Sequence, residues 1–242
     1  MNSGAAARVV TVDGTAGSGK STLGRRLALA LALPLIDTGL FYRGVMVAAV
    51  ASGLDPRDSD GAAALAQRTQ IEVNTDPGAT EGGWQLRVDG VDPGELARDP
   101  RLATLLSTLS AIPGVRAAIL TQQRRPAQRC GAVAVGRDCG TVVFPDAMVK
   151  FYLWAAPEVR AHRRALQLAA AGTGIDEAAL SDEIAGRDAL DRDRAASPLR
   201  PAADAHMIDT GTVSVTAMVA EAVALCRARG LAVPGGLAGE PV

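Results

Sequence analysis

Cysteine and histidine are scarce in this chain, which bears on metal binding and on disulfide formation. The three cysteines, Cys130, Cys139 and Cys226, are odd in number and widely spaced, so they fit neither a disulfide framework nor a C-x-x-C metal pair. His162 and His206 are the only histidines, and with so few ligands a zinc site is not expected. This cysteine usage favours a reducing compartment, and we expect a cytoplasmic protein.

Aromatic residues and an excess of either charge are also lacking. Phe, Trp and Tyr make up 3% of the sequence, and 25 basic residues balance 26 acidic ones to a net charge of −1. Such a chain offers neither a stacking platform nor a basic surface to nucleic acid. Its apolar runs end well short of the ~18 residues that a membrane helix needs. Residues 1–8 lack the charged start and apolar middle of a signal peptide. We therefore expect no nucleic-acid partner and no membrane association.

The chain does have enough apolar material for one α/β core. Hydrophobic residues make up 48% of its 242 residues, and this length suits a single domain with a small insert. We predict one domain over residues 8–230, with flexible tails at 1–7 and 231–242. We expect the domain to act as a monomer.

The most informative stretch runs from Arg8 to Thr22 and reads RVVTVDGTAGSGKST. An apolar run ends at Asp13, and Gly14–Ser21 then fits G-x-x-x-x-G-K-[ST], the pattern of a phosphate-binding loop. Glycines let phosphates approach the backbone, while N–H groups and the next helix N-terminus face the anion. In this pattern Lys20 contacts the outer phosphates and the Ser21 hydroxyl holds Mg²⁺. Lysine is rare here, at two of 25 basic residues, so its presence in this slot is informative. The alternative is a glycine-rich β–α turn without a ligand, but the pattern favours nucleoside triphosphate binding.

The rest of the chain alternates between strand and helix patterns. We expect buried strands at about 9–12, 35–36, 133–135, 149–154 and 205–209, and helices at about 21–33, 40–51, 96–110, 115–129, 157–171, 176–195 and 214–229. Thr38 is the expected N-cap of the second helix, residues 53–60 are expected to be a loop, and Pro113 should break the helical pattern. Alternating apolar and polar residues predict a small antiparallel insert at about 70–92. This order predicts a doubly wound parallel sheet with helices on both faces, and ligands at the carboxyl ends of its strands.

Two polar clusters follow apolar runs and are candidates for an acceptor site. In Asp37–Arg43, the guanidinium of Arg43 is suited to grip a phosphate. In Gly136–Thr141, Arg137 and Asp138 lie between glycines at the end of a strand, where ligand contact is common. Each cluster also has a structural interpretation: a capped helix with a solvated arginine, and an ion pair in a turn. The residues alone leave both alternatives open.

A third polar cluster lies near residue 190. Arg187, Asp191 and Arg194 share one face at helical spacing. A helix with i,i+4 ion pairs would show the same pattern, so this segment alone also favours a structural interpretation. The same ambiguity applies to three arginines on the preceding predicted helix, Arg160, Arg163 and Arg164.

Together these motifs make the chain similar to the bacterial-type cytidylate kinases, a nucleoside monophosphate kinase family. The similarity covers about Val9 to Arg229 and rests on six ordered motifs: GTAGSGKST, DTGLFYR, SAIPGVR, GRDCGTVVFPDA, RAHRRALQL and RDALDRDR. It implies a P-loop core at about 8–64 and 107–230, a β-rich monophosphate-binding insert at about 65–106 and a short helical lid at about 160–190. It also implies the reaction, in which ATP with Mg²⁺ phosphorylates CMP or dCMP to CDP or dCDP.

The resemblance further implies a role for each matching residue. The ATP site would comprise Gly14, Thr15, Ala16, Gly17, Ser18, Gly19, Lys20, Ser21 and Thr22, with Arg160 and Arg164 from the lid. The phosphate contacts of the acceptor would come from Arg43, Arg137 and Arg194, which with Lys20 form the catalytic set. Tyr42 would also line the CMP site, with Thr38, Arg116 and Asp138 around the cytosine and Ser107, Arg187 and Asp191 at the sugar. Ser21 would hold Mg²⁺.

Three positions depart from the commonest pattern of this family. Thr38 stands where Ser is usual, Ala16 replaces a Ser, and Cys139 replaces a Met. Thr38 keeps a hydroxyl, and the other two changes bear only on fine tuning. Asp138 suits cytosine because a carboxylate accepts from the N4 amino group, whereas uracil presents an acceptor there. We expect Arg116 to donate to N3 or O2, and CMP to be preferred over UMP.

Two rival functions share the phosphate loop. One is a related P-loop kinase whose acceptor is AMP, UMP or a metabolic hydroxyl. The other is a nucleotide-dependent switch without transferase activity, which would hydrolyse ATP slowly without an acceptor. A switch has little use for three arginine-containing acceptor motifs, so the sequence favours the kinase.

Overall fold

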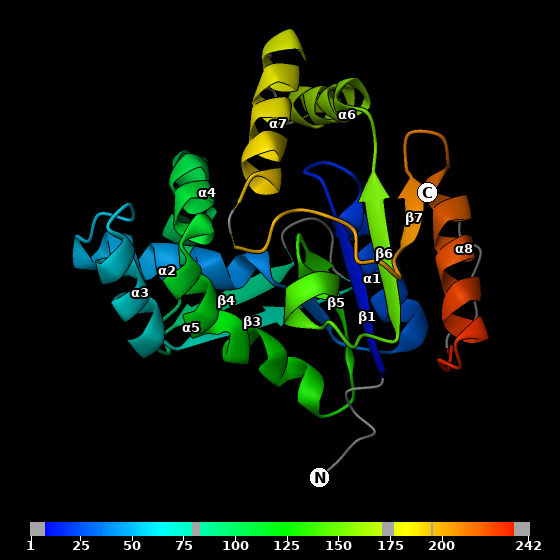
Figure 1. The fold of residues 1–242 in the computed structure, drawn as a ribbon, viewed down its shortest axis with the longest axis horizontal. Helices are drawn as coiled ribbons and strands as arrows, with labels where there is room; N and C mark the ends of the chain where they lie inside the picture. The colour runs from blue at the N-terminus through cyan, green and yellow to red at the C-terminus, as the bar shows by residue number, and fades with distance from the viewer. Residues whose placement is uncertain (1–7, 79–82, 171–176, 195, 235–242) are drawn as a thin grey trace.

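The computed structural model describes residues 8–78, 83–170, 177–194 and 196–234. Within them, five strands form one sheet in the order β2-β5-β1-β6-β7, and every neighbouring pair is parallel (Figure 1). The strands are β1 (Val9–Gly14), β2 (Leu35–Asp37), β5 (Ala132–Gly136), β6 (Val149–Trp154) and β7 (His206–Asp209). The predicted doubly wound parallel sheet is confirmed.

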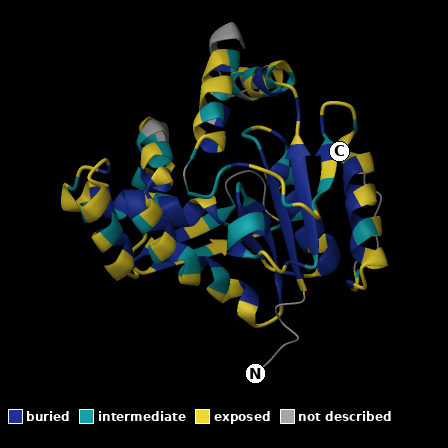
Figure 2. Cartoon of the chain, viewed as in Figure 1, coloured by how far each residue is buried: buried dark blue, intermediate teal, exposed yellow. Residues whose placement is uncertain are grey.

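The sheet is buried on both faces, which explains why its strands are nearly continuous apolar runs. Figure 2 shows β1, β5 and β6 as almost entirely buried, the edge strand β7 as only partly buried, and the surrounding helices as buried on one side. Successive side chains point to opposite faces. Val10 and Val12 of β1 therefore enter one hydrophobic cluster, while Val9 enters another.

One face is covered by α1 (Lys20–Leu31) and α8 (Val215–Ala228). Leu23 and Leu27 of α1 pack there with Val223 of α8 against the strands. Ser214 caps α8, since its hydroxyl oxygen accepts from the backbone N–H of Ala217 at 3.2 Å.

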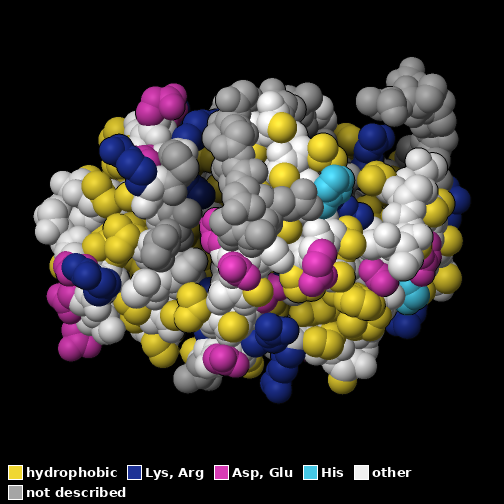
Figure 3. Space-filling view, turned by 90° about the horizontal axis from the view of Figure 1, so that it is seen from above, with side chains coloured by type: hydrophobic (Ala, Val, Ile, Leu, Met, Phe, Trp, Pro, Cys, Tyr) yellow, Lys and Arg dark blue, Asp and Glu magenta, His cyan; other side chains and the backbone are white. Residues whose placement is uncertain are grey.

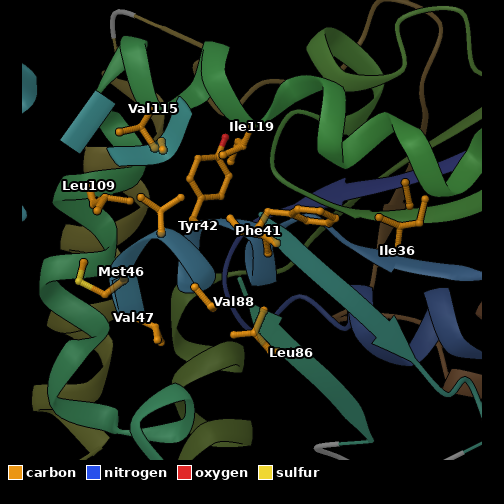
Figure 4. Close-up of a cluster of buried hydrophobic side chains, with 14 of the residues drawn as sticks. Ile36, Phe41, Tyr42, Met46, Val47, Leu86, Val88, Leu109, Val115 and Ile119 are labelled. Carbon is orange, nitrogen blue, oxygen red and sulfur yellow. The ribbon is translucent and has the colours of Figure 1, made fainter. Parts of the chain in front are cut away.

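The other face carries the larger helical layer and the insert. Its elements are α2 (Gly39–Ser52), α3 (Ser59–Arg68), α4 (Ala103–Ala111), α5 (Pro113–Arg124) and the antiparallel pair β3 (Ile71–Thr75) and β4 (Trp84–Val88). Figure 4 shows Phe41 and Tyr42 of α2 among side chains from β4, α4 and α5. The predicted antiparallel pair is confirmed, and it shares one hydrophobic core with α2, α3, α4 and α5.

Two helices lie above the carboxyl ends of the strands, α6 (Pro157–Ala170) and α7 (Glu177–Arg192) (Figure 1). They correspond to the segment predicted as the lid, of which residues 171–176 lie outside the described part. Short helical turns complete the fold: η2 (Gly94–Arg98), η3 (Pro100–Leu102), η4 (Arg125–Gln128) and the π-helical turn η5 (Cys139–Val143). None of the helices in the described part of the chain combines the length and the apolar character of a bilayer-spanning segment.

Several local predictions need correction. Thr38 occupies the N-cap position of α2, as expected, but its backbone angles are helical and its side chain makes no capping hydrogen bond; the hydroxyl donates instead to the carbonyl oxygen of Val135 at 3.0 Å. Helix α3 begins within the expected loop, where Asp58 is its N-cap. The helical pattern breaks just before Pro113, close to the predicted point: α4 ends at Ala111, and Pro113 is the first residue of α5, because proline suits the first helical turn. The packed chain also extends past residue 230, since Leu231 is buried in the α1–α8 layer.

Helix α1 packs so closely on the sheet that it requires a glycine. A Cβ on Gly24 would lie 2.3 Å from Cγ1 of Val135 and 3.3 Å from Cδ1 of Leu35. We expect Gly24→Ala to lower the free energy of unfolding by about 1–3 kcal/mol, since overpacking outweighs the better helix propensity of alanine. Urea denaturation measures this.

The matched control is Gly186→Ala on α7. No described heavy atom lies within 4 Å of a Cβ placed there, and the residue is exposed. This change should raise stability by about 0.5–1 kcal/mol through helix propensity alone. Equal stabilisation by both substitutions would contradict the close packing of α1.

Candidate functional site

A single cavity of about 330 Å³ brings the phosphate loop and the polar clusters together. It opens at the carboxyl ends of β2 and β5, where a doubly wound sheet is expected to bind ligands. Its lining comes from the phosphate loop and α1, from α2, α4, α5 and α7, and from the ends of both strands. On the face of the molecule seen from above, acidic and basic side chains are dispersed among hydrophobic ones (Figure 3). Among the residues that the structure describes, this face shows no basic patch, whereas several charged side chains line the cavity.

The phosphate loop connects β1 to α1 and depends on its glycines. A Cβ on Gly14 would lie 2.0 Å from the carbonyl oxygen of Leu153, so β6 passes too close for any other residue. Gly19 has φ 87°, a left-handed conformation that suits glycine, and it immediately precedes α1. Ala16, Gly17, Lys20 and Ser21 line the cavity. This backbone presents the start of α1 to an anion.

Lys20 is held inside this loop. Its Nζ donates to the carbonyl oxygen of Thr15, and the side chain is buried. Burial lowers the pKa of the Lys20 ammonium well below its ordinary value, and the charge of Arg137 lowers it further, while Asp37 and Asp13 oppose the change. A bound polyphosphate would favour the charged form of Lys20.

Oxygen ligands suited to Mg²⁺ lie beside the loop. The exposed Ser21 and the carboxylate of Asp37 line the same cavity, and Oδ1 of Asp37 accepts from the Gly39 N–H at 2.9 Å. Within the described residues, no group of three acidic, His or Cys side chains is arranged to hold a metal alone. Mg²⁺ usually takes one or two protein oxygens and completes its shell with phosphates and water, so the oxygens of Ser21 and Asp37 suit it.

In the same cavity, Arg116 and Asp138 form a buried ion pair. Nη1 of Arg116 also donates to the carbonyl oxygen of Ser110 at 2.8 Å, and its guanidinium lies 5.1 Å from the Tyr42 ring centre. Nε of Arg116 is buried and has no hydrogen-bond partner among the residues that the structure describes. Such an unpaired donor is costly unless a ligand satisfies it.

Asp191 of α7 holds two further arginines at the cavity. Its Oδ2 accepts from Nε of Arg137 at 3.0 Å, and its Oδ1 pairs with Arg194. Arg194 also donates to Oγ of Ser110 at 3.2 Å. The structure thus brings together Arg137 and Arg194, which lie far apart in the sequence, through one buried carboxylate.

Other predicted site residues lie at varying distances from this centre. Thr38, Tyr42 and Ser107 line the cavity. Among the described residues of that lining Arg43 is absent; its Nη1 donates to the carbonyl oxygen of Ala97 at 2.7 Å. Burial raises the pKa of the Cys139 thiol well above its ordinary value, so this group, 3.6 Å from Oγ1 of Thr38, stays neutral.

The predicted lid arginines occupy different environments. Arg160 is buried and pairs with Asp188 at 2.6 Å, and it donates to the carbonyl oxygens of Ala16 at 3.0 Å and Ala155 at 2.9 Å. It thereby connects the phosphate loop to α7. Arg164 is exposed on α6, and neither arginine is among the described lining residues of the cavity. Arg187 belongs to α7, but its side chain lies outside the described part. Contacts of these arginines with nucleotides stay predictions.

Sequence reasoning assigned no role to three residues that organise the site. Asp37 and Asp13 each end a short apolar run just before a loop, which is a usable signal for a functional carboxylate. Ser110 accepts hydrogen bonds from both Arg116 and Arg194. Ser110 is the first residue of the SAIPGVR motif, but that motif does not indicate that Ser110 would hold two arginines.

Comparison with known proteins identifies the family. The model of the family described as cytidylate kinase matches residues 10–228. The cytidylate kinase of Pelotomaculum thermopropionicum is 42% identical over 215 residues, covering 89% of this chain and 94% of that protein. Those of Corynebacterium efficiens and Shigella flexneri are each 40% identical, over 91% and 92% of this chain and 94% and 96% of their own lengths. The chain therefore belongs to the cytidylate kinase family and is a phosphotransferase.

Proposed function

We propose that this enzyme transfers the γ-phosphoryl group of ATP, bound with Mg²⁺, to CMP and dCMP in pyrimidine nucleotide metabolism. One observation carries the proposal: the buried Arg116–Asp138 pair lies in the same cavity as Lys20 and Ser21. A phosphate loop alone would support only triphosphate binding. A second polar cluster in the same cavity supplies the place for an acceptor.

Cytosine is the base that this polar cluster suits best. Its N4 amino group donates, and Asp138 is an acceptor, while the guanidinium of Arg116, which lines the same cavity, can donate to N3 or O2. Uracil would instead set its O4 acceptor against the carboxylate. Thr38 and Tyr42, which also line the cavity, would enclose the base, and Ser107 would contact the sugar.

The reaction requires alignment and charge neutralisation more than acid–base chemistry. Two anionic phosphates must approach each other, and their oxygens repel. Lys20, Arg137 and Arg194 offset that repulsion; Asp191 holds the two guanidinium groups in one orientation before any ligand arrives. Mg²⁺, held by Ser21 with the ATP phosphates, would neutralise further charge on the transferring group.

Arg43 would join these residues only after a change of rotamer. It is half-buried on α2, and its bond to the Ala97 carbonyl directs it to the insert. Its predicted contact with the acceptor phosphate therefore depends on exchanging one carbonyl oxygen for a phosphate oxygen. The bond to Ala97 joins an ionised donor to a neutral oxygen, whereas a phosphate offers the guanidinium an ionised acceptor and a bidentate contact, so the exchange is favourable.

An acceptor panel tests the proposal. Release of ADP from ATP is measured with CMP, dCMP, UMP and AMP as acceptors. We expect kcat/KM for CMP and dCMP to exceed that for UMP by about 10-fold or more, the discrimination of one good bidentate contact. Preference for AMP, UMP or a hydroxyl acceptor would assign a different kinase activity. ADP release that is independent of every acceptor would indicate a nucleotide switch.

A further inference from the structure

Asp13 is a buried carboxylate at the point where β1 passes into the phosphate loop. It is 5% exposed, and both of its oxygens accept backbone hydrogen bonds from one turn. Oδ1 accepts from the Cys139 N–H at 2.8 Å, and Oδ2 accepts from the Gly140 N–H at 2.6 Å. The carboxylate thus ties the strand that carries the phosphate loop to the turn that follows β5.

That turn begins at Asp138. The carbonyl oxygen of Asp138 accepts from the N–H groups of Val142 at 2.9 Å and Val143 at 3.1 Å, which closes the π-helical turn η5. Asp13 engages the first two N–H groups of the same turn. The backbone of Asp138 is therefore held by η5 and Asp13, while its side chain is held by Arg116.

The turn has no room for a different arrangement. A Cβ on Gly140 would lie 2.8 Å from Oγ1 of Thr11, 3.2 Å from Cδ of Lys150 and 3.3 Å from Oδ2 of Asp13. Only glycine lets its N–H approach the carboxylate this closely.

Charged and titratable groups from three elements face Asp13. They are Lys20 at the start of α1, Asp138 and Cys139 at η5, and Tyr152 on β6. Burial raises the pKa of Asp13 to about 6, Asp138 adds to the rise, and the two backbone N–H groups oppose it. Asp13 consequently changes charge at a pH where an enzyme is still assayable.

We propose that Asp13 is a positioning residue for base selection: its carboxylate fixes the turn that aims Asp138 at the base of the acceptor. This inference rests on the proposed function, since it assumes that Asp138 selects cytosine. Below about pH 6, a proton occupies one carboxylate oxygen, which then stops accepting its N–H. The turn loosens, and preference for CMP over UMP falls.

The test follows the ratio of kcat/KM for CMP to that for UMP between pH 5 and pH 8. Both substrates carry the same monophosphate, which itself titrates near pH 6, so the ratio cancels its contribution. We expect the wild-type ratio to be constant above pH 7 and to fall by about tenfold at pH 5, the effect of one lost hydrogen bond. In Asp13→Asn the amide NH₂ group, which is a donor, faces one of the two backbone N–H donors, so one hydrogen bond is lost at every pH. The CMP/UMP ratio of this variant should therefore be low at every pH, with KM for CMP raised more than KM for ATP.

Two further variants separate positioning from general damage. Asp55→Asn removes an exposed carboxylate that pairs with Arg57 at 2.8 Å, and it should keep the wild-type ratio and pH profile. Gly140→Ala displaces the same N–H without removing Asp13, and it should lower the ratio like Asp13→Asn. Thermal melting checks that each variant is folded.

Three outcomes would overturn the inference. One is a wild-type ratio that stays constant down to pH 5. Another is an Asp13→Asn ratio equal to that of the wild type. The third is a fall with pH that persists unchanged in Asp13→Asn, which would assign the titration to another group. A wild type without any preference for CMP at pH 8 would instead contradict the proposed function.

Discussion

We expect Arg137→Ala to lower kcat for CMP phosphorylation by about 10³-fold or more, the range for an arginine that stabilises charge in phosphoryl transfer. Arg137 lines the cavity together with Lys20, and Asp191 fixes its Nε at 3.0 Å. The side chain is therefore oriented before substrates bind, and its full interaction is available to the transition state. Single-turnover measurements at saturating ATP and CMP isolate this step from product release.

Arg137→Lys tests whether charge alone suffices. A lysine keeps the charge but loses the planar fork that contacts two oxygens at once. We expect an intermediate loss, with Arg57→Ala, on an exposed pair with Asp55, as the unaffected control. Because Asp191 keeps Arg194 as a partner, Arg137→Ala should remain folded, which urea denaturation verifies. A kcat within tenfold of the wild type would remove Arg137 from the catalytic set.

Much of the fold is predictable because its signals are local. The strands β1, β5 and β6 are apolar runs because both faces of the sheet are covered, and this pattern needs no knowledge of the partners. The alternation of apolar and polar residues in β3 and β4 likewise indicates that one face of each strand is buried. Helix α3 was missed because its capping residue, Asp58, lies among other residues typical of loops, and only the helical packing gives it meaning.

The sequence predicts which residues belong to the site better than it predicts which of them contact one another. Helical spacing predicts Asp191 and Arg194 on one face; α7 ends at Arg192, before Arg194, yet the two side chains do pair. Spacing cannot show that Asp191 also reaches Arg137, 54 residues away. Arg43 and Arg160 illustrate the same limit: their bonds to the carbonyl oxygens of Ala97 and Ala16 depend on tertiary packing. Sequence motifs identify which side chains belong to the site, while the direction in which each side chain points depends on the fold.

Asp138→Asn should lower the ratio of kcat/KM for CMP to that for UMP by about 10- to 100-fold, since a good bidentate contact to a base is worth ~1–3 kcal/mol. Arg116 has only donors, so the amide oxygen of the new asparagine must accept from it. The amide nitrogen is then left facing the base, where it matches the O4 acceptor of uracil and opposes the N4 amino group of cytosine. The substitution thus reverses the local hydrogen-bond pattern without removing the partner of Arg116.

Because it keeps a partner for Arg116, Asp138→Asn is a better test than Asp138→Ala. Asp138→Ala would leave the buried Arg116 without its carboxylate, and breaking one partner of such a pair costs ~3–5 kcal/mol of stability. Loss of activity in that variant would report damage to the fold as much as base selection. Asp138→Asn keeps an acceptor, so its melting temperature should stay closer to that of the wild type than the melting temperature of Asp138→Ala. Asp55→Asn, at an exposed pair, controls for the change from carboxylate to amide. If the folded Asp138→Asn enzyme keeps the wild-type preference for CMP, cytosine must be selected elsewhere in the cavity, with Thr38 the next residue to substitute because its hydroxyl lines the same cavity.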